Sequence, residues 1–153
     1  MRELGLAAAS PDASLTRGTV GCVALDVHGN IAAGTSTGGM TAKMPGRVGD
    51  SPLIGAGCYA NNATLGVSCT GTGEQFIRHV AAHDLSALVR YKGVSLVEAA
   101  RVVLSEGVEI DDGGLIAIDR HGNIVAATTT GCMPRAWARG DGGTHLQIWD
   151  DAR

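Results

Sequence analysis

A glycine followed by a threonine, Gly18-Thr19, is the first candidate for chemistry in this sequence of 153 residues. A threonine hydroxyl is a poor nucleophile unless a base lies beside it, and a threonine with a free α-amine carries its own base. Cleavage of the bond between Gly18 and Thr19 would create that arrangement. Taken alone, Thr19 is more simply a β-branched residue that begins a strand, so its interpretation depends on the motifs downstream of it in the chain.

Arg47 and Asp50 come next, among glycines and a proline in the run Gly46-Arg47-Val48-Gly49-Asp50-Ser51-Pro52. An arginine fork binds a carboxylate through two hydrogen bonds, and an aspartate binds an ammonium group. A free α-amino acid moiety offers both groups, so this pair predicts a clamp for it. The alternative is a surface salt bridge between the two side chains, which would stabilise little.

Two more runs place threonines among glycines: Thr35-Ser36-Thr37-Gly38-Gly39 and Cys69-Thr70-Gly71-Thr72-Gly73-Glu74. In the second run, backbone amides of a strand-to-helix turn can hold an oxyanion or a carboxylate. A phosphate loop is the alternative there, but no Gly-Lys-Ser/Thr comes after it. For Thr37 the alternative is a hydroxyl that satisfies a turn at a strand end.

These motifs, in this order, resemble the plant-type L-asparaginase / isoaspartyl aminopeptidase family of N-terminal-nucleophile hydrolases. The resemblance extends from Gly18 to about Trp149 and concerns the nucleophile-bearing β-subunit, the C-terminal half of the family's precursor. It implies that autocatalytic cleavage after Gly18 releases Thr19 as the nucleophile, with Thr37 supporting its activation.

The resemblance also implies the remaining site roles. Arg47 and Asp50 would bind the α-carboxylate and the α-amine of the substrate. Thr70 and Gly71 would form the oxyanion hole, and Gly73 would help to bind substrate. The implied reaction is hydrolysis of L-asparagine or β-aspartyl dipeptides through a β-aspartyl ester, which needs no cofactor and no metal.

The implied partners are an α-subunit, from the same precursor or a separate chain, and a second αβ unit. Two alternatives stay open. One is glycosylasparaginase, which shares the nucleophile, the clamp and the oxyanion hole. The other is an inactive β-subunit fragment that lacks its α-subunit and exposes apolar hairpin faces.

Charge, hydropathy and histidine spacing argue against several other classes of partner and site. The net charge is −3, with no run of lysine or arginine, which argues against nucleic acid or an anionic membrane as partner. No apolar stretch approaches the ~20 residues that span a bilayer. The histidines His79 and His83 lack the glutamate of a zinc-protease helix, so we expect no metal site there.

The cysteines do not indicate a metal site either, because none forms a Cys-x-x-Cys pair. We expect all of the cysteines to be buried free thiols, which fits a cytoplasmic location of the protein. They are Cys22, Cys58, Cys69 and Cys132. Residues 1–18 are expected to be a leader or precursor remnant, and residues 19–153 one nucleophile-bearing domain.

An internal repeat organises the chain. Residues 23–40 align without gaps to residues 116–133, with 11 of 18 pairs identical. Each copy predicts a hairpin with a His-Gly-Asn turn, and its mostly apolar strands predict cover on both faces. At the same offset Thr19 corresponds to Asp112, so only the first copy can present a threonine nucleophile.

Other elements are expected between and after the two hairpins. Strands are predicted over residues 54–59 and 63–69, and a final strand over 144–149. The apolar spacing predicts a helix over residues 74–91 that ends at Gly93. A capping box of Ser95 and Glu98 predicts a second helix to about residue 106. This order predicts the α/β class, with the chain supplying the β-subunit half of a four-layer α/β/β/α sandwich.

Overall fold

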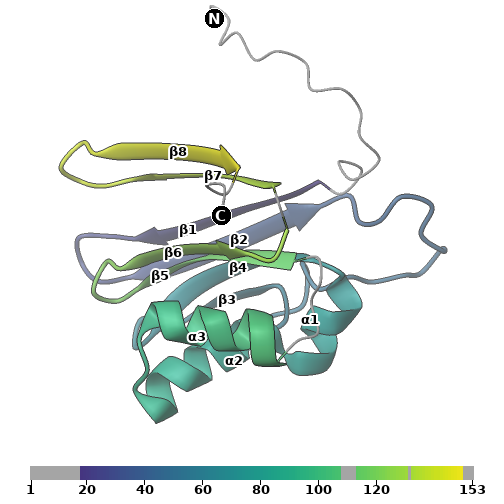
Figure 1. Cartoon of the computed structure of the whole chain (residues 1–153), viewed down its shortest axis with the longest axis horizontal. Helices are drawn as coiled ribbons and strands as arrows, with labels where there is room; N and C mark the ends of the chain where they lie inside the picture. Colours follow the sequence, from purple (N-terminus) through teal and green to yellow (C-terminus); the bar gives the residue numbers. More distant parts are fainter. Residues whose placement is uncertain (1–17, 108–112, 131, 150–153) are drawn as a thin grey trace, which may run out of the picture.

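The computed structural model describes residues 18–107, 113–130 and 132–149. The predicted leader lies outside these residues except for Gly18, and so does Asp112. Within them, helices cover one face of a four-stranded sheet and two hairpins lie over the other side (Figure 1). The mixed α/β class is therefore confirmed. A four-layer sandwich would need a further helical layer over the hairpins and stays a prediction.

The central sheet is antiparallel, with the order β3-β4-β5-β6. Its strands are β3 (Cys58–Ala60), β4 (Leu65–Gly71), β5 (Gly113–Asp119) and β6 (Ile124–Thr128). The first five residues of β4 are buried, and β5 is buried at five of its seven positions. Cover on both faces, predicted from the unpatterned apolar sequence, is thus confirmed for β5 of the second repeat copy, whereas β6 of that copy is half-buried at all five positions.

The first repeat copy forms the hairpin of β1 (Thr19–Leu25) and β2 (Ile31–Thr37). It packs on β4 and β5 through its inward face, where Gly21 approaches Ser68 so closely that no Cβ would fit. Its outward face is bare: Val20 is 69% exposed. The prediction of cover on both faces is therefore wrong for this hairpin within the described chain, because no described element packs over it.

A third hairpin pairs β7 (Cys132–Ala138) with β8 (Thr144–Trp149). The sequence predicted β8 but not β7, since Pro134 interrupts the strand pattern. The structure accommodates Pro134 at a shift in register between Cys132 and Arg135. The ring of Trp137 stacks on His145, its neighbour across the hairpin, with 4.1 Å between ring centroids.

The helical layer contains α1 (Gly73–His79), α2 (Ala81–Ala87), the π-helical segment η2 (Leu88–Lys92), α3 (Leu96–Val102) and the π-helical segment η3 (Val103–Gly107). Its apolar side packs on β4, β5 and β6. Phe76 and Leu85 from the helices and Leu65 and Leu115 from the sheet are at most 1% exposed. This core covers the face of the sheet that lies opposite the hairpins.

One predicted helix, over residues 74–91, is broken at Val80, which adopts φ +50°. A β-branched residue rarely takes this conformation. The break turns two backbone amides outward to the preceding loop: Ala82 N–H donates to Ala56 O (3.1 Å) and His83 N–H to Gly55 O (2.9 Å). These tertiary hydrogen bonds override the helical pattern. The end at Gly93, at φ +68°, is as predicted.

Candidate functional site

Thr19 and Thr37 lie directly opposite each other, at the open end of the β1–β2 hairpin. The hydroxyl of Thr19 donates to Thr37 Oγ1 (3.3 Å), and the hydroxyl of Thr37 donates to Gly18 O (3.3 Å). Gly39 N–H also donates to Thr37 Oγ1 (3.0 Å). Thr37 therefore accepts from the candidate nucleophile and donates to the carbonyl of the candidate cleavage bond.

The hairpin is anchored beneath this pair by a network that the sequence did not reveal. Thr35 Oγ1 lies 2.7 Å from Ser68 Oγ on β4 and donates to Gly57 O (3.2 Å). Thr35 lies two residues before Thr37 and therefore on the same face of β2. The network joins the strand that ends at Thr37 to the sheet and to the loop carrying Asp50, since Gly57 N–H donates to Asp50 O (3.2 Å).

Asp50 has a buried carboxylate, one oxygen of which is available to a ligand. The residue is 6% exposed, and its Oδ2 has no hydrogen-bond partner among the described residues. Burial raises the pKa of Asp50, while backbone hydrogen bonds and the charge of Arg47 partly oppose that rise. Unpaired buried carboxylates are costly, so this group is suited to receive a cation.

Two glycines allow the chain to close around Asp50. A Cβ on Gly57 would lie 2.6 Å from Asp50 Oδ2, and one on Gly73 would lie 2.9 Å from Asp50 Oδ1. The Gly73 position is also 3.1 Å from Arg47 Nη2. The sequence predicted Gly73 as a substrate-binding residue, and the structure places it against both members of the predicted clamp.

Arg47 is paired with Glu74 rather than with Asp50. Its Nε donates to Glu74 Oε1 (2.8 Å) and its Nη2 to Glu74 Oε2 (3.0 Å). This hydrogen bonding raises the pKa of Arg47 and lowers the pKa of Glu74. The sequence missed this partner because it lies 27 residues away, at the start of α1.

Thr70 and Gly71 end β4, next to the turn that leads into α1. Gly71 has φ +144°, a conformation that other residues rarely adopt, and Thr72 is the N-cap residue of α1. The structure thus places the predicted oxyanion-hole residues at the end of a central strand, beside the hairpin that packs on it.

A small hollow of about 20 Å³ gathers most of the predicted site. Its lining residues come from the β1–β2 hairpin, the loop after that hairpin and the end of β4: Thr19, Thr37, Gly39, Met40, Arg47, Gly49, Asp50 and Gly71. Gly18, Thr70 and Gly73 adjoin these residues in the chain or by contact. The structure therefore brings Thr19, Thr37, Arg47, Asp50 and Gly71 to one hollow, with the other predicted residues next to it.

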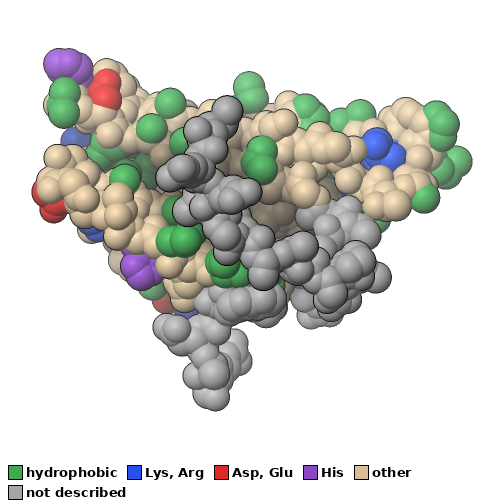
Figure 2. Space-filling view, turned by 90° about the horizontal axis from the view of Figure 1, so that it is seen from above, with side chains coloured by type: hydrophobic (Ala, Val, Ile, Leu, Met, Phe, Trp, Pro, Cys, Tyr) green, Lys and Arg blue, Asp and Glu red, His purple; other side chains and the backbone are tan. Residues whose placement is uncertain are grey.

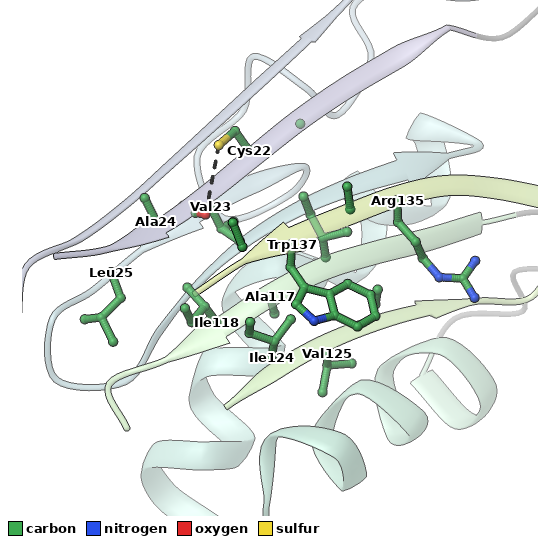
Figure 3. Close-up of a pocket in the computed structure, with 15 residues that line it drawn as sticks. Cys22, Val23, Ala24, Leu25, Ala117, Ile118, Ile124, Val125, Arg135 and Trp137 are labelled. Carbon is green, nitrogen blue, oxygen red and sulfur yellow. Dashed lines mark hydrogen bonds between the residues drawn. The ribbon is translucent and has the colours of Figure 1, made fainter. Parts of the chain in front are cut away.

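A larger groove, of about 360 Å³, lies elsewhere (Figure 3). Its floor is formed by β5 and β6, and its two walls by β1 and β7. The labelled side chains are mostly apolar, among them Leu25, Ile118, Ile124 and Trp137. Its size does not make it the better candidate for chemistry, because it contains no residue of the predicted site.

Metal-ligating residues form no cluster of three or more within the described ranges. His79 ends α1 and His83 lies on α2, and both are exposed. The His83 ring also packs edge-on against Tyr59, with 5.2 Å between ring centroids. No helix in the described part of the chain is long and apolar enough to cross a membrane.

All four cysteines are free, but they are not all buried as predicted. Cys69 is buried in the core, and burial raises its pKa. Cys58 and Cys132 are partly buried, and Cys22 is exposed. Cys22 differs because β1 alternates its side chains, and this one points to the bare outward face of the hairpin.

Known proteins are similar to this chain over most of its length. A family model described as asparaginase matches residues 3–148. An isoaspartyl peptidase of Escherichia coli (strain K12) is 62% identical over 122 residues, which cover 78% of this chain and 38% of that protein.

Relatives from other organisms are less identical in sequence. A putative isoaspartyl peptidase/L-asparaginase of Dictyostelium discoideum is 50% identical over 127 residues (82% of this chain, 36% of that protein). An isoaspartyl peptidase/L-asparaginase of Homo sapiens is 43% identical over 146 residues (92% of this chain, 46% of that protein). The chain spans less than half the length of these relatives.

Proposed function

The chain belongs to the asparaginase family, and on that premise we propose that it is the nucleophile-bearing part of an amidohydrolase. The substrates are L-asparagine, β-aspartyl dipeptides or both, and Thr19 becomes the nucleophile after cleavage of the Gly18–Thr19 bond. The single observation that carries the proposal is the meeting of Thr19, Arg47 and Asp50 around one hollow. These groups match a hydroxyl nucleophile and the two charged ends of an amino acid.

Cleavage depends on the hydrogen bonds at the end of the hairpin. The hydroxyl of Thr37 polarises the Gly18 carbonyl, and Thr19 Oγ1 attacks that carbon. The peptide C–N bond breaks, the amine of Thr19 takes up a proton, and an ester links Gly18 to Thr19. Water hydrolyses the ester, which leaves the Gly18 carboxylate and restores the hydroxyl beside a free α-amine.

Substrate hydrolysis repeats this chemistry on an external carbonyl. The α-amine of Thr19 accepts the hydroxyl proton as Oγ1 attacks the side-chain amide. Arg47 binds the substrate's α-carboxylate and Asp50 Oδ2 its α-ammonium. Thr70 and Gly71 stabilise the oxyanion. The amine leaves with a proton as ammonia or an amino acid, and water then releases aspartate from the ester.

A partner chain completes the second β layer. The groove runs between β1 and β7, each the edge strand of its own hairpin, over an apolar floor. Edge strands with open backbone groups accept a further strand. Figure 2 looks onto this layer and shows hydrophobic side chains on it with few charged ones. We assign this surface to an α-subunit, in a cytoplasmic dimer of αβ units.

The test is hydrolysis by the assembled protein. This chain is co-expressed with the N-terminal part of its 62% identical Escherichia coli relative, and release of ammonia and of amino acids is measured with asparagine, a β-aspartyl dipeptide and glycosyl-asparagine. The proposal predicts turnover of one or both of the first two substrates, and its loss in Thr19→Ala, which keeps the fold. Equal turnover in Thr19→Ala would refute the nucleophile assignment. Preference for glycosyl-asparagine would assign glycosylasparaginase instead.

A further inference from the structure

Glu74 holds one edge of the Arg47 guanidinium. The carboxylate takes hydrogen bonds from Nε and Nη2, the geometry in which a carboxylate occupies one side of the planar group. The Arg47 side chain is 17% exposed and that of Glu74 is 51% exposed. The arginine is thus held from its outer side by an acidic group at the surface.

The other edge of the guanidinium faces the site. Arg47 lines the hollow together with Gly49 and Asp50, whereas Glu74 does not. A Cβ on Gly49 would lie 3.1 Å from Arg47 Nη1, and one on Gly73 would lie 3.1 Å from Nη2. The absence of side chains at both glycines leaves room for the guanidinium beside them, and the two hydrogen bonds to Glu74 fix its rotation.

From this geometry we infer that Glu74 is a positioning residue, which orients the free edge of Arg47 toward the carboxylate of the bound substrate. The inference rests on the proposed function. The arginine side chain has several rotatable bonds, so an unheld Arg47 would lose rotamer entropy each time it bound a substrate. Because Glu74 already holds Arg47 in one rotamer, that entropy is not lost again when a substrate binds. Its lowered pKa keeps the carboxylate ionised at neutral pH.

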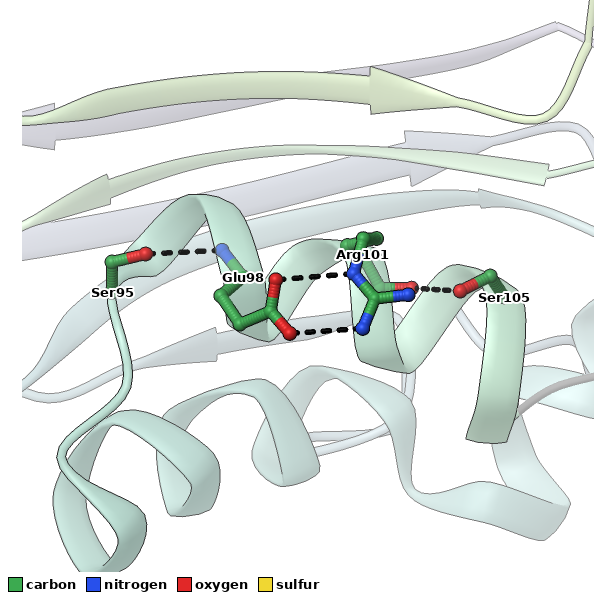
Figure 4. Close-up of polar contacts among 4 residues, drawn as sticks. All are labelled: Ser95, Glu98, Arg101 and Ser105. Carbon is green, nitrogen blue, oxygen red and sulfur yellow. Dashed lines mark hydrogen bonds and ion pairs between the residues drawn. The ribbon is translucent and has the colours of Figure 1, made fainter.

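A second ion pair of the same form provides a matched control. On α3, Arg101 Nε and Nη2 donate to Glu98 Oε2 (3.0 Å) and Oε1 (2.9 Å) (Figure 4). This pair spans three residues of one helix and lies away from the hollow. Such surface pairs contribute little to stability. Any kinetic effect specific to Glu74 therefore comes from its place beside Arg47.

The test compares Glu74→Gln with Glu98→Gln in the assembled protein. Glutamine keeps the size of the side chain but cannot accept both hydrogen bonds. Glu74→Gln is expected to raise KM for asparagine about tenfold while kcat changes less than about twofold, because ground-state and transition-state binding weaken together. Glu74→Asp, which keeps the carboxylate, is expected to recover part of the loss. Glu98→Gln is expected to match wild type.

Titration with L-aspartate, the product of the proposed reaction, separates this inference from the proposed function, since binding needs no turnover. Weaker aspartate binding in Glu74→Gln than in the unsubstituted protein supports the positioning role, even in a protein without hydrolysis. Equal binding, an unchanged KM, or a fall in kcat at constant KM would overturn it. Absence of saturable aspartate binding in the unsubstituted protein would overturn both the inference and the proposed clamp.

Discussion

The two copies of the internal repeat form the same turn in different surroundings. Asp26 Oδ1 accepts from the backbone amides of His28 and Asn30 in the first copy, and Asp119 Oδ1 accepts from the corresponding amides in the second. The first hairpin is a separate layer with a bare outward face, whereas the second lies within the central sheet. The shared sequence therefore specifies a hairpin and not its place in the fold.

The strand ends of the two copies differ most. Thr37 bonds to Thr19 and to Gly18 O, whereas its counterpart Thr130 lies 2.8 Å from Thr128 Oγ1 and donates to Cys132 O (3.0 Å). The second threonine satisfies its own turn. In the proposed function, only the first copy takes part in chemistry, through the Gly18-Thr19 step before it and the loop after it, which carries Arg47 and Asp50.

The loop after the first hairpin should carry the largest effect. Asp50→Asn is expected to raise KM for asparagine about 100-fold, because a buried charge pair with the substrate's ammonium is lost. The short segment after the second hairpin, residues 129–131, contains no carboxylate. An unchanged KM would remove Asp50 from the clamp and weaken the contrast between the copies.

The same substitution should stabilise the unliganded protein. Because burial raises the pKa of Asp50 above its ordinary 3.8, the folded state favours the protonated form, and the ionised form destabilises it at neutral pH. Asp50→Asn should therefore raise Tm at pH 7, by about 2–4 °C for a change near 1 kcal/mol. The gain should vanish as pH falls to the ordinary pKa. A lower Tm at pH 7 would contradict this account of the burial.

The corresponding threonines of the two copies, Thr37 and Thr130, should show a difference of intermediate size in reaction rate. Thr37→Val removes the hydrogen bonds to Thr19 and Gly18 and should slow both self-cleavage and turnover roughly tenfold, since a hydrogen bond contributes about 1 kcal/mol. Thr130→Val should change melting temperature but neither rate. Equal losses of rate in the two variants would mean that both threonines act only through the fold.

The turn aspartates should give the smallest difference, and only in stability. Asp119 is 7% exposed, so Asp119→Ala leaves partly buried amides without a partner and should cost about 1–3 kcal/mol. Asp26 is exposed, and water can replace its carboxylate in Asp26→Ala. Thermal melts of the two variants decide this, and a larger loss for Asp26→Ala would contradict the burial argument.

Local patterns predicted much of this molecule. The hairpin repeat placed Thr19 opposite Thr37, and Ser95 caps α3 by accepting from Glu98 N–H (3.2 Å). The predicted capping box is only half formed, because the Glu98 carboxylate pairs with Arg101. Each of these features depends on residues close in sequence or on a repeated pattern.

Features set by distant contacts could not be predicted. The break at Val80 depends on carbonyls of Gly55 and Ala56, which no helical periodicity encodes. The pairing of Arg47 with Glu74 depends on how the loop meets α1. The bare face of the first hairpin resembles a covered one in sequence, because its outward residues on β1, Val20, Cys22 and Ala24, are apolar.

The most direct test of the central claim is the intact mass of this chain over several days, assembled with the complementary α-subunit and beside a Thr19→Ala control. The account predicts loss of the segment that precedes Thr19, in the native sequence alone. A full-length mass that persists in the folded assembly, or cleavage that also occurs in Thr19→Ala, would contradict the assignment of Thr19 as the nucleophile.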